Sequence, residues 1–214
     1  MTSPRIWYLT YGSNLALARF RCYLSGGRPS GGQRHYAGCR DRSEPTLTAG
    51  IHVPGGLRFA AESGVWGGGM AFFDRTASGV VAGRAYLITA DQFGDVAAQE
   101  RRRPPGGEFA RDLAGLLPDL ETVVATGPGH YETVVRLGEL DGAPMFTITY
   151  HDVPSLDPTA PTAAYLWWII TGLREAHGYD DARIARYLVA APGVRGEWTE
   201  TEILALAATE HSVA

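Results

Sequence analysis

Short apolar segments alternate with turns rich in glycine, proline and aspartate through most of this chain. The first segment, residues 6–10, runs directly into the polar sequence YGSNL at residues 11–15. This change of pattern predicts a strand that ends in a loop, followed by a helix over about residues 14–24. Similar apolar runs predict further strands at 57–59, 70–73, 80–88, 134–137 and 145–150. Too few helices separate these runs for a doubly wound parallel sheet, so we expect a mixed sheet.

Helix signals are clearest after the central strands. Thr89 and Gln92 have the spacing of a capping box, which predicts a helix that begins there and runs to Glu100. In a later segment, apolar residues recur every three to four positions and share a face with Tyr165, so this tyrosine should point inward. The segments expected to be helical after residue 100 are 108–117, 162–177, 180–190 and 199–208.

The loop at residues 11–15 has the composition of a ligand-binding turn. Gly12 lets the backbone approach a ligand closely. The amides of Ser13, Asn14 and Leu15 lie where a following helix leaves its first N–H groups unpaired, and such donors favour an anion or an oxyanion. The alternative from the residues alone is an ordinary turn in which Ser13 or Asn14 caps that helix.

Composition describes one globular domain of 214 residues, 45% hydrophobic and 20% charged. The net charge of −4 argues against a general nucleic-acid surface, although residues 101–103 are three consecutive arginines. No apolar stretch is long enough for a membrane span or follows a basic start as in a signal peptide. We therefore expect a cytoplasmic protein with neither nucleic acid nor membrane as partner.

All 19 cationic side chains are arginine, because the sequence contains no lysine. Phosphate-binding loops of the Walker type and Schiff-base enzymes both need a lysine, so these classes are excluded. The six histidines show no helical metal-pair spacing, and the two cysteines form no Cys-x-x-Cys motif, so we expect no metal site. Gly12-Ser13-Asn14 also lacks the second glycine of a serine-hydrolase elbow.

The sequence YGSNL after an N-terminal strand resembles the signature of the γ-glutamylcyclotransferase family. Other segments follow in the order of that family: residues 67–71 and 80–86 resemble its middle strands, and 97–100 resembles the segment with its catalytic glutamate. Tyr131 resembles the tyrosine that resumes the fold, and residues 161–165 resemble the start of a late helix with a further active-site tyrosine. The match covers roughly two thirds of the chain, in broken pieces.

The fold implied by this resemblance is a single α+β domain over residues 1–214, a small, mostly antiparallel β-barrel with peripheral helices. Because the family passes from its glutamate to the next strand in a few residues, residues 101–129 are interpreted as an insertion. This insertion would form either a lid or a surface excursion without a chemical role. Residues from about 180 to 214 would form a C-terminal helical extension.

The reaction implied by the resemblance is intramolecular and needs no cofactor. The α-amine of a small γ-glutamyl amine or amide attacks its own side-chain carbonyl, which releases the amine and leaves 5-oxoproline. An enzyme for this reaction mainly has to hold the glutamyl chain curled and exclude water.

Each site residue takes a role from the same resemblance. Glu100 would be the acid/base, and Tyr131 and Tyr165 would close the pocket through their hydroxyls. Tyr11 would pack behind the loop, and the glutamyl group would be held by Gly12, Ser13, Asn14 and Leu15. Arg101 stands where the family commonly has glycine, and the arginines at 101–103 would weaken Glu100 as a base if they faced its carboxylate.

Three other functions remain open from the sequence. The loop could belong to a catalytically silent binding module for a small ligand, and a purely structural role would leave no pocket between the loop and Glu100. Within the enzyme class, the same residues could remove a γ-glutamyl group from a metabolite during biosynthesis or detoxification.

Trp167, Trp168 and Trp198 would either fix the C-terminal helices or contribute to a homodimer.

Overall fold

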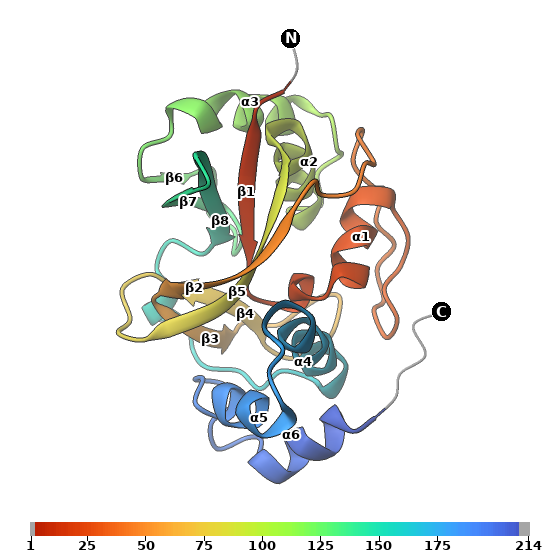
Figure 1. The fold of residues 1–214 in the computed structure, drawn as a ribbon, viewed down its shortest axis with the longest axis vertical. Coiled ribbons are helices and arrows are strands. Elements are labelled where there is room, and N and C mark those ends of the chain that lie inside the picture. Colours follow the sequence, from red (N-terminus) through yellow and green to blue (C-terminus); the bar gives the residue numbers. More distant parts are fainter. Residues whose placement is uncertain (1–2, 210–214) are drawn as a thin grey trace.

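The computed structural model describes residues 3–209, which fold around a six-stranded sheet in the order β2-β5-β1-β8-β7-β6 (Figure 1). Only the β1–β8 pair is parallel, so the sheet is mostly antiparallel, as predicted. A separate antiparallel pair is formed by β3 and β4. The strands are β1 Arg5–Thr10, β2 Thr48–Pro54, β3 Gly56–Ala60, β4 Met70–Asp74, β5 Val80–Thr89, β6 Val123–Ala125, β7 Thr133–Leu140 and β8 Ala143–Thr149.

The expected barrel is not closed. Within the described residues β2 pairs only with β5, and β6 pairs only with β7, so both are edges of the sheet. Within the described residues, β3 and β4 form a strand ladder only with each other, and their further hydrogen bonds go to loops and side chains, such as that from the Phe59 amide to the Pro192 carbonyl at 2.8 Å. Without a strand that joins the two edges, the sheet remains open.

Helices cover both faces of this sheet. On one face lie α1 and α2, with α3 packed against α2, and on the other lie α4, α5 and α6 (Figure 1). Side chains of β1 alternate between two cores, with Ile6 and Tyr8 in one and Trp7 and Leu9 in the other. The helices are α1 Leu17–Ser25, α2 Ala90–Glu100, α3 Glu108–Leu116, α4 Ala163–His177, α5 Asp181–Val189 and α6 Glu200–Ala207.

Capping interactions fix where several helices begin and end. The predicted box at Thr89 and Gln92 is formed in both directions, and Thr199 with Glu202 forms a second one at α6. Gly178 ends α4 in the left-handed conformation that favours glycine. No helix within residues 3–209 has the length and apolar character needed to cross a membrane.

The segment interpreted as an insertion is a packed part of the fold. Its helix α3 approaches α2 so closely that a Cβ at Gly94 would lie 2.2 Å from the Ala110 carbonyl oxygen. Leu113 and Leu117 lie in the same core as Phe93 of α2. The division into one domain, an insertion at 101–129 and an extension at 180–214 stays a prediction, and residues 210–214 of that extension lie outside the described part.

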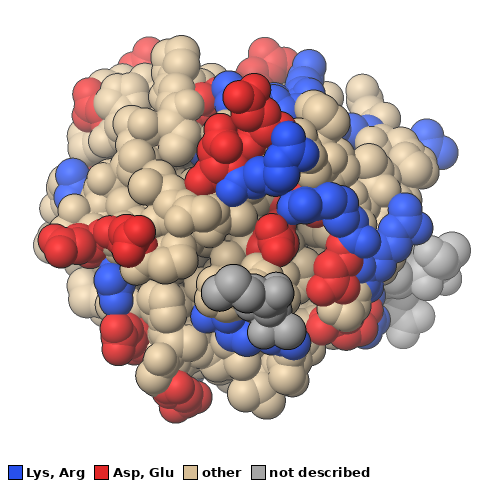
Figure 2. Space-filling view, turned by 90° about the horizontal axis from the view of Figure 1, so that it is seen from above, with Lys and Arg blue, Asp and Glu red and all other residues tan. Residues whose placement is uncertain are grey.

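Arginine and acidic side chains alternate on the face that lies above α2 and α3 (Figure 2). Arg40 pairs with two acidic residues of α2, with Asp91 at 3.4 Å and with the buried Asp95 at 3.1 Å. The face seen in Figure 2 therefore carries no large patch of one sign.

Candidate active site

The YGSNL loop follows β1, and side chains of β5 hold it by donating hydrogen bonds to the carbonyl groups of the loop. The Tyr86 hydroxyl donates to the Asn14 carbonyl at 2.8 Å, and Arg84 donates to the Leu15 carbonyl at 3.1 Å. Arg84 also pairs with Glu175 of α4 at 2.6 Å. Because β5 and α4 both fix the loop, its backbone is preorganised before any ligand arrives.

The loop forms a short 3-10 turn at Ser13–Leu15 rather than the predicted helix start, and α1 begins at Leu17. Neither helix has a side-chain cap, so the interpretation of Ser13 or Asn14 as a cap is wrong. The Leu15 amide donates to the Gly12 carbonyl at 3.0 Å and is not free for a ligand, contrary to the prediction. The turn uses this donor because its i+3 hydrogen bond closes at that amide.

Gly12 is required by the space around it rather than by its φ of −106°. A Cβ at this position would lie 2.8 Å from the Tyr165 hydroxyl oxygen and 3.4 Å from the Cβ of Ala71. The close approach of loop, β4 and α4 therefore depends on the missing side chain.

A cavity of about 320 Å³ opens beside this loop. Its size suits a small metabolite. Leu15 is the one predicted site residue outside the wall, since its side chain is fully buried in the core against α4. The predicted residues that line the cavity are Tyr11, Gly12, Ser13, Asn14, Glu100, Tyr131 and Tyr165.

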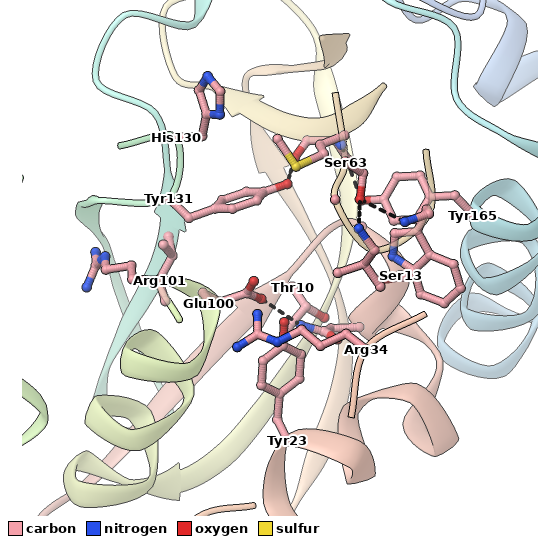
Figure 3. Close-up of a pocket in the computed structure, with 18 of the residues that line it drawn as sticks. Thr10, Ser13, Tyr23, Arg34, Ser63, Glu100, Arg101, His130, Tyr131 and Tyr165 are labelled. Atoms are coloured by element: carbon pink, nitrogen blue, oxygen red, sulfur yellow. Dashed lines mark hydrogen bonds between the residues drawn. The ribbon is translucent and has the colours of Figure 1, made fainter. Parts of the chain in front are cut away.

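Glu100 is the last residue of α2 and reaches the cavity from the end of that helix (Figure 3). The Asn14 side-chain amide donates to its carboxylate at 3.4 Å, which joins the glutamate to the loop. The preceding residue, Gln99, is buried and holds this helix end to α1 by donating to the Tyr23 carbonyl at 3.0 Å. The half-buried carboxylate is thus fixed beside the loop.

The helix α2 ends in a Schellman motif directly after Glu100. The Arg103 amide donates to the Ala98 carbonyl and the Arg102 amide to the Gln99 carbonyl, with Arg102 at φ 57°. The Arg101 guanidinium points away from Glu100 in Figure 3 and lies 4.5 Å from the ring centre of Phe109 in α3. Burial lowers the pKa of Arg101 to about 10.

Tyr131 and Tyr165 enter the cavity from opposite sides (Figure 3). Both are anchored on Ala71 of β4: Tyr131 donates to its carbonyl at 2.8 Å, and the Ala71 amide donates to the Tyr165 hydroxyl at 3.2 Å. The proton of Tyr165 is therefore left to donate to a ligand. The Tyr11 hydroxyl donates to the Ile148 carbonyl at 2.6 Å, which places this ring behind the loop.

Buried and half-buried tyrosines line the same cavity as Glu100. Burial raises the pKa of five cavity tyrosines, and the charge of Glu100 adds to the increase in each. For Tyr165 the pKa rises to about 12. These hydroxyls are neutral donors at neutral pH, and they belong to Tyr8, Tyr11, Tyr23, Tyr131 and Tyr165.

Several wall residues were not predicted from the sequence. Arg19 and Tyr23 follow Leu15 at intervals of four residues, so helical spacing was the signal that could have found them. Arg34, Tyr36 and Trp66 come from connections without a periodic pattern and gave no such signal. Within residues 3–209, no group of three or more histidine, cysteine, aspartate or glutamate side chains could hold a metal ion.

Solved structures with this architecture include γ-glutamyl cyclotransferase, which aligns over 95% of this chain and 98% of its own, with a TM-score of 0.51 and 14% identity. An uncharacterized protein from Homo sapiens aligns over 96% of this chain and 99% of its own, with a TM-score of 0.51 and 15% identity. No protein-family model matches the chain. Identities this low show the fold alone.

Among curated proteins, histone deacetylase 5 of Arabidopsis thaliana is 36% identical over 152 residues, or 67% of this chain. The chain spans 23% of the length of that relative. The similarity therefore concerns one part of a longer protein. From the open, mostly antiparallel sheet and the two aligned structures, the chain has the γ-glutamyl cyclotransferase-like fold.

Proposed function

We propose that this protein converts a γ-glutamyl amine or amide into 5-oxoproline and the free amine, with Glu100 as the acid/base. The observation that carries the proposal is the hydrogen bond between Asn14 of the loop and the Glu100 carboxylate at the wall of one cavity. The fold shared with γ-glutamyl cyclotransferase supports it.

In the proposed reaction, the α-amine nitrogen attacks the γ-carbonyl carbon of the same molecule. Glu100 accepts the proton that the attacking nitrogen loses and then gives it to the leaving nitrogen as the carbon–nitrogen bond breaks. The ring closes within one molecule, so the protein mainly has to hold the curled conformer in a small space. The cavity of about 320 Å³ is suited to that task.

Polar groups of the wall stabilise the charge that develops on the carbonyl oxygen. The missing side chain at Gly12 lets the Tyr165 hydroxyl lie against the loop, and the proton of this hydroxyl is directed from a fixed ring. Each preorganised donor of this kind contributes about 3–4 kcal/mol in enzymes where it has been removed. The proposed chemistry uses no cofactor.

The proposal is tested by measuring 5-oxoproline release from γ-glutamyl amino acids, γ-glutamylamines and glutathione. Release from any member of this panel supports the proposal and identifies the leaving amine. If the folded protein forms no product from any of them, the cyclotransferase assignment is overturned for these substrates.

A second candidate is a catalytically silent module that binds a small ligand through the loop. The relative named histone deacetylase 5 favours a binding module, because the similar sequence makes up only 23% of that longer protein, whose name describes a different activity. A silent module predicts that 5-oxoproline binds to the cavity and that no γ-glutamyl compound is turned over.

A further inference from the structure

Arg19 is a buried cation at the cavity wall. Its side chain is 2% exposed, and it makes no ion pair within the described residues. Its Nε and Nη1 atoms find no hydrogen-bond partner among residues 3–209. A buried charge in this condition is costly unless an anion accompanies it.

Aromatic rings enclose this guanidinium. Its carbon lies 4.7 Å from the ring centre of Tyr23, 4.5 Å from that of Tyr36 and 5.7 Å from that of Trp66. Stacking of this kind offsets part of the cost of burial and leaves the net positive charge in place. The charge therefore acts on whatever occupies the cavity that these rings line.

Two tyrosine hydroxyls connect the Arg19 guanidinium to the cavity through hydrogen bonds. Arg19 Nη2 donates to the Tyr36 hydroxyl at 2.7 Å and to the Tyr23 hydroxyl at 3.4 Å. A hydroxyl that accepts from a cation is polarised and becomes a stronger donor of its own proton. In Figure 3 the Tyr23 hydroxyl points into the cavity near Glu100.

The wall thus presents a negative and a positive group to the same small space. Glu100 faces the cavity from α2, and its charge helps to raise the pKa of Arg19 against the opposing effect of burial. An α-amino acid carries an amine and a carboxylate on one carbon, which is the complement of this pair. The loop offers fewer anion donors than expected, since the Leu15 amide is already bonded.

We propose that Arg19, acting through the hydroxyls of Tyr23 and Tyr36, forms a carboxylate subsite that receives the α-carboxylate of the γ-glutamyl group. The identity of this ligand rests on the proposed function. Arg19 is a positioning residue in this arrangement, because the hydroxyls touch the ligand. With the carboxylate on the Arg19 side, the amine of the same carbon is directed to Glu100.

The test compares the binding of 5-oxoproline with that of 5-oxoprolinamide, two rings that differ only in the carboxylate. Native protein should bind 5-oxoproline about tenfold or more tightly than the amide, as for a charge-assisted hydrogen bond. In Arg19→Met this ratio should fall to near one. Tyr36→Phe, which removes one hydroxyl and keeps the ring, should lower the ratio as well.

Arg21→Met is the matched control on the same helix, because Arg21 is exposed and pairs with Glu44 on the surface. It should keep the native ratio. Unliganded Arg19→Met loses the ring stacking and the two hydrogen bonds to tyrosine hydroxyls, so it should melt below native protein, and binding is compared below both melting temperatures. A purely structural arginine predicts the native ratio in folded Arg19→Met.

The inference is overturned if Arg19→Met keeps the native preference for the carboxylate, or if Arg34→Met abolishes that preference while Arg19→Met does not. Neither result depends on turnover. Carboxylate-selective binding without any product would support the subsite and overturn the proposed reaction. Turnover by the native protein together with an unchanged ratio in Arg19→Met would support the proposed reaction and overturn the subsite.

Discussion

The cavity wall is built from the loop after β1, the ends of helices and irregular connections. Seven of the eight residues expected from the family resemblance lie in it: four on the loop, Glu100 at the end of α2, Tyr165 near the start of α4 and Tyr131 just before β7. Leu15 is the exception: its amide closes the turn and its side chain enters the core. Arg34 and Trp66 lie on irregular connections, whose path depends on tertiary contacts that no local pattern encodes.

At the residue scale, Gly12→Ala should impair binding and turnover. The added Cβ would lie 2.8 Å from the Tyr165 hydroxyl oxygen, so the tyrosine has to move from its bond with the Ala71 amide. We expect KM to rise and kcat to fall while circular dichroism remains native.

The control for this change is Gly115→Ala in α3, where an added Cβ meets nothing within 4 Å. Alanine is favoured over glycine in a helix, so this variant should gain about 0.5–1 kcal/mol of stability and keep its activity. Native kinetics in Gly12→Ala would contradict the close approach of loop and Tyr165.

At the element scale, long periodic segments were predicted well and short edges were not. The helices at α2 and α4 through α6 were found through caps and spacing, which are local signals. The edge strands β2 and β6 were missed, because β2 is half exposed with no clear apolar run and β6 has only three residues. Openness of the sheet follows from which strands pair, and pairing is a long-range property.

The helix α3 is expected to affect the site through Phe109. The guanidinium carbons of Arg101 and Arg103 lie 4.5 Å and 4.4 Å from the centre of this ring. Phe109→Ala removes the stacking and part of the packing, so we expect a loss of about 1–3 kcal/mol of stability. Arg101 is then free to turn toward Glu100, and turnover should fall.

Phe109→Tyr keeps an aromatic ring and should retain native stability and turnover. Thermal melts and steady-state kinetics, measured below the melting temperature of both variants, separate the two effects. Native turnover in folded Phe109→Ala would contradict a role for this ring in keeping Arg101 away from Glu100.

At the scale of the whole molecule, the sheet is buried on both faces, which explains why the sequence of β1 is a nearly continuous apolar run. Side chains of β1 serve two cores, one under α1 and α2 and one under α4. Tyrosine is prominent in both cores and around the cavity. The fold therefore buries many ionisable hydroxyls in their neutral form.

This burial predicts a loss of stability at alkaline pH. Burial raises the pKa of Tyr165 and Tyr187 to about 12, above the unfolded value of 10.0, and also raises the pKa of Tyr8, Tyr23 and Tyr131 well above that value. The stabilisation is fully present below pH 10 and is lost as the pH rises toward the folded-state values. Between the unfolded-state and folded-state pKa values, each tyrosine that stays protonated in the fold lowers the free energy of unfolding by about 1.4 kcal/mol per pH unit.

Paired measurements of tyrosine ionisation by absorbance and of secondary structure by circular dichroism test this expectation. We expect most tyrosines to ionise together with unfolding above pH 10. Gradual ionisation near pH 10 with the fold intact would mean that the hydroxyls of the cavity wall are open to solvent.

The most direct test of the central claim is the turnover of a γ-glutamyl substrate by Glu100→Gln beside Glu62→Gln, an exposed glutamate on the same cavity wall. We expect Glu100→Gln to lose about 10²–10⁴-fold in 5-oxoproline release and still to bind 5-oxoproline. Glu62→Gln should retain most of the turnover. Equal loss in both variants, or native release by Glu100→Gln, would contradict the assignment of Glu100 as the acid/base.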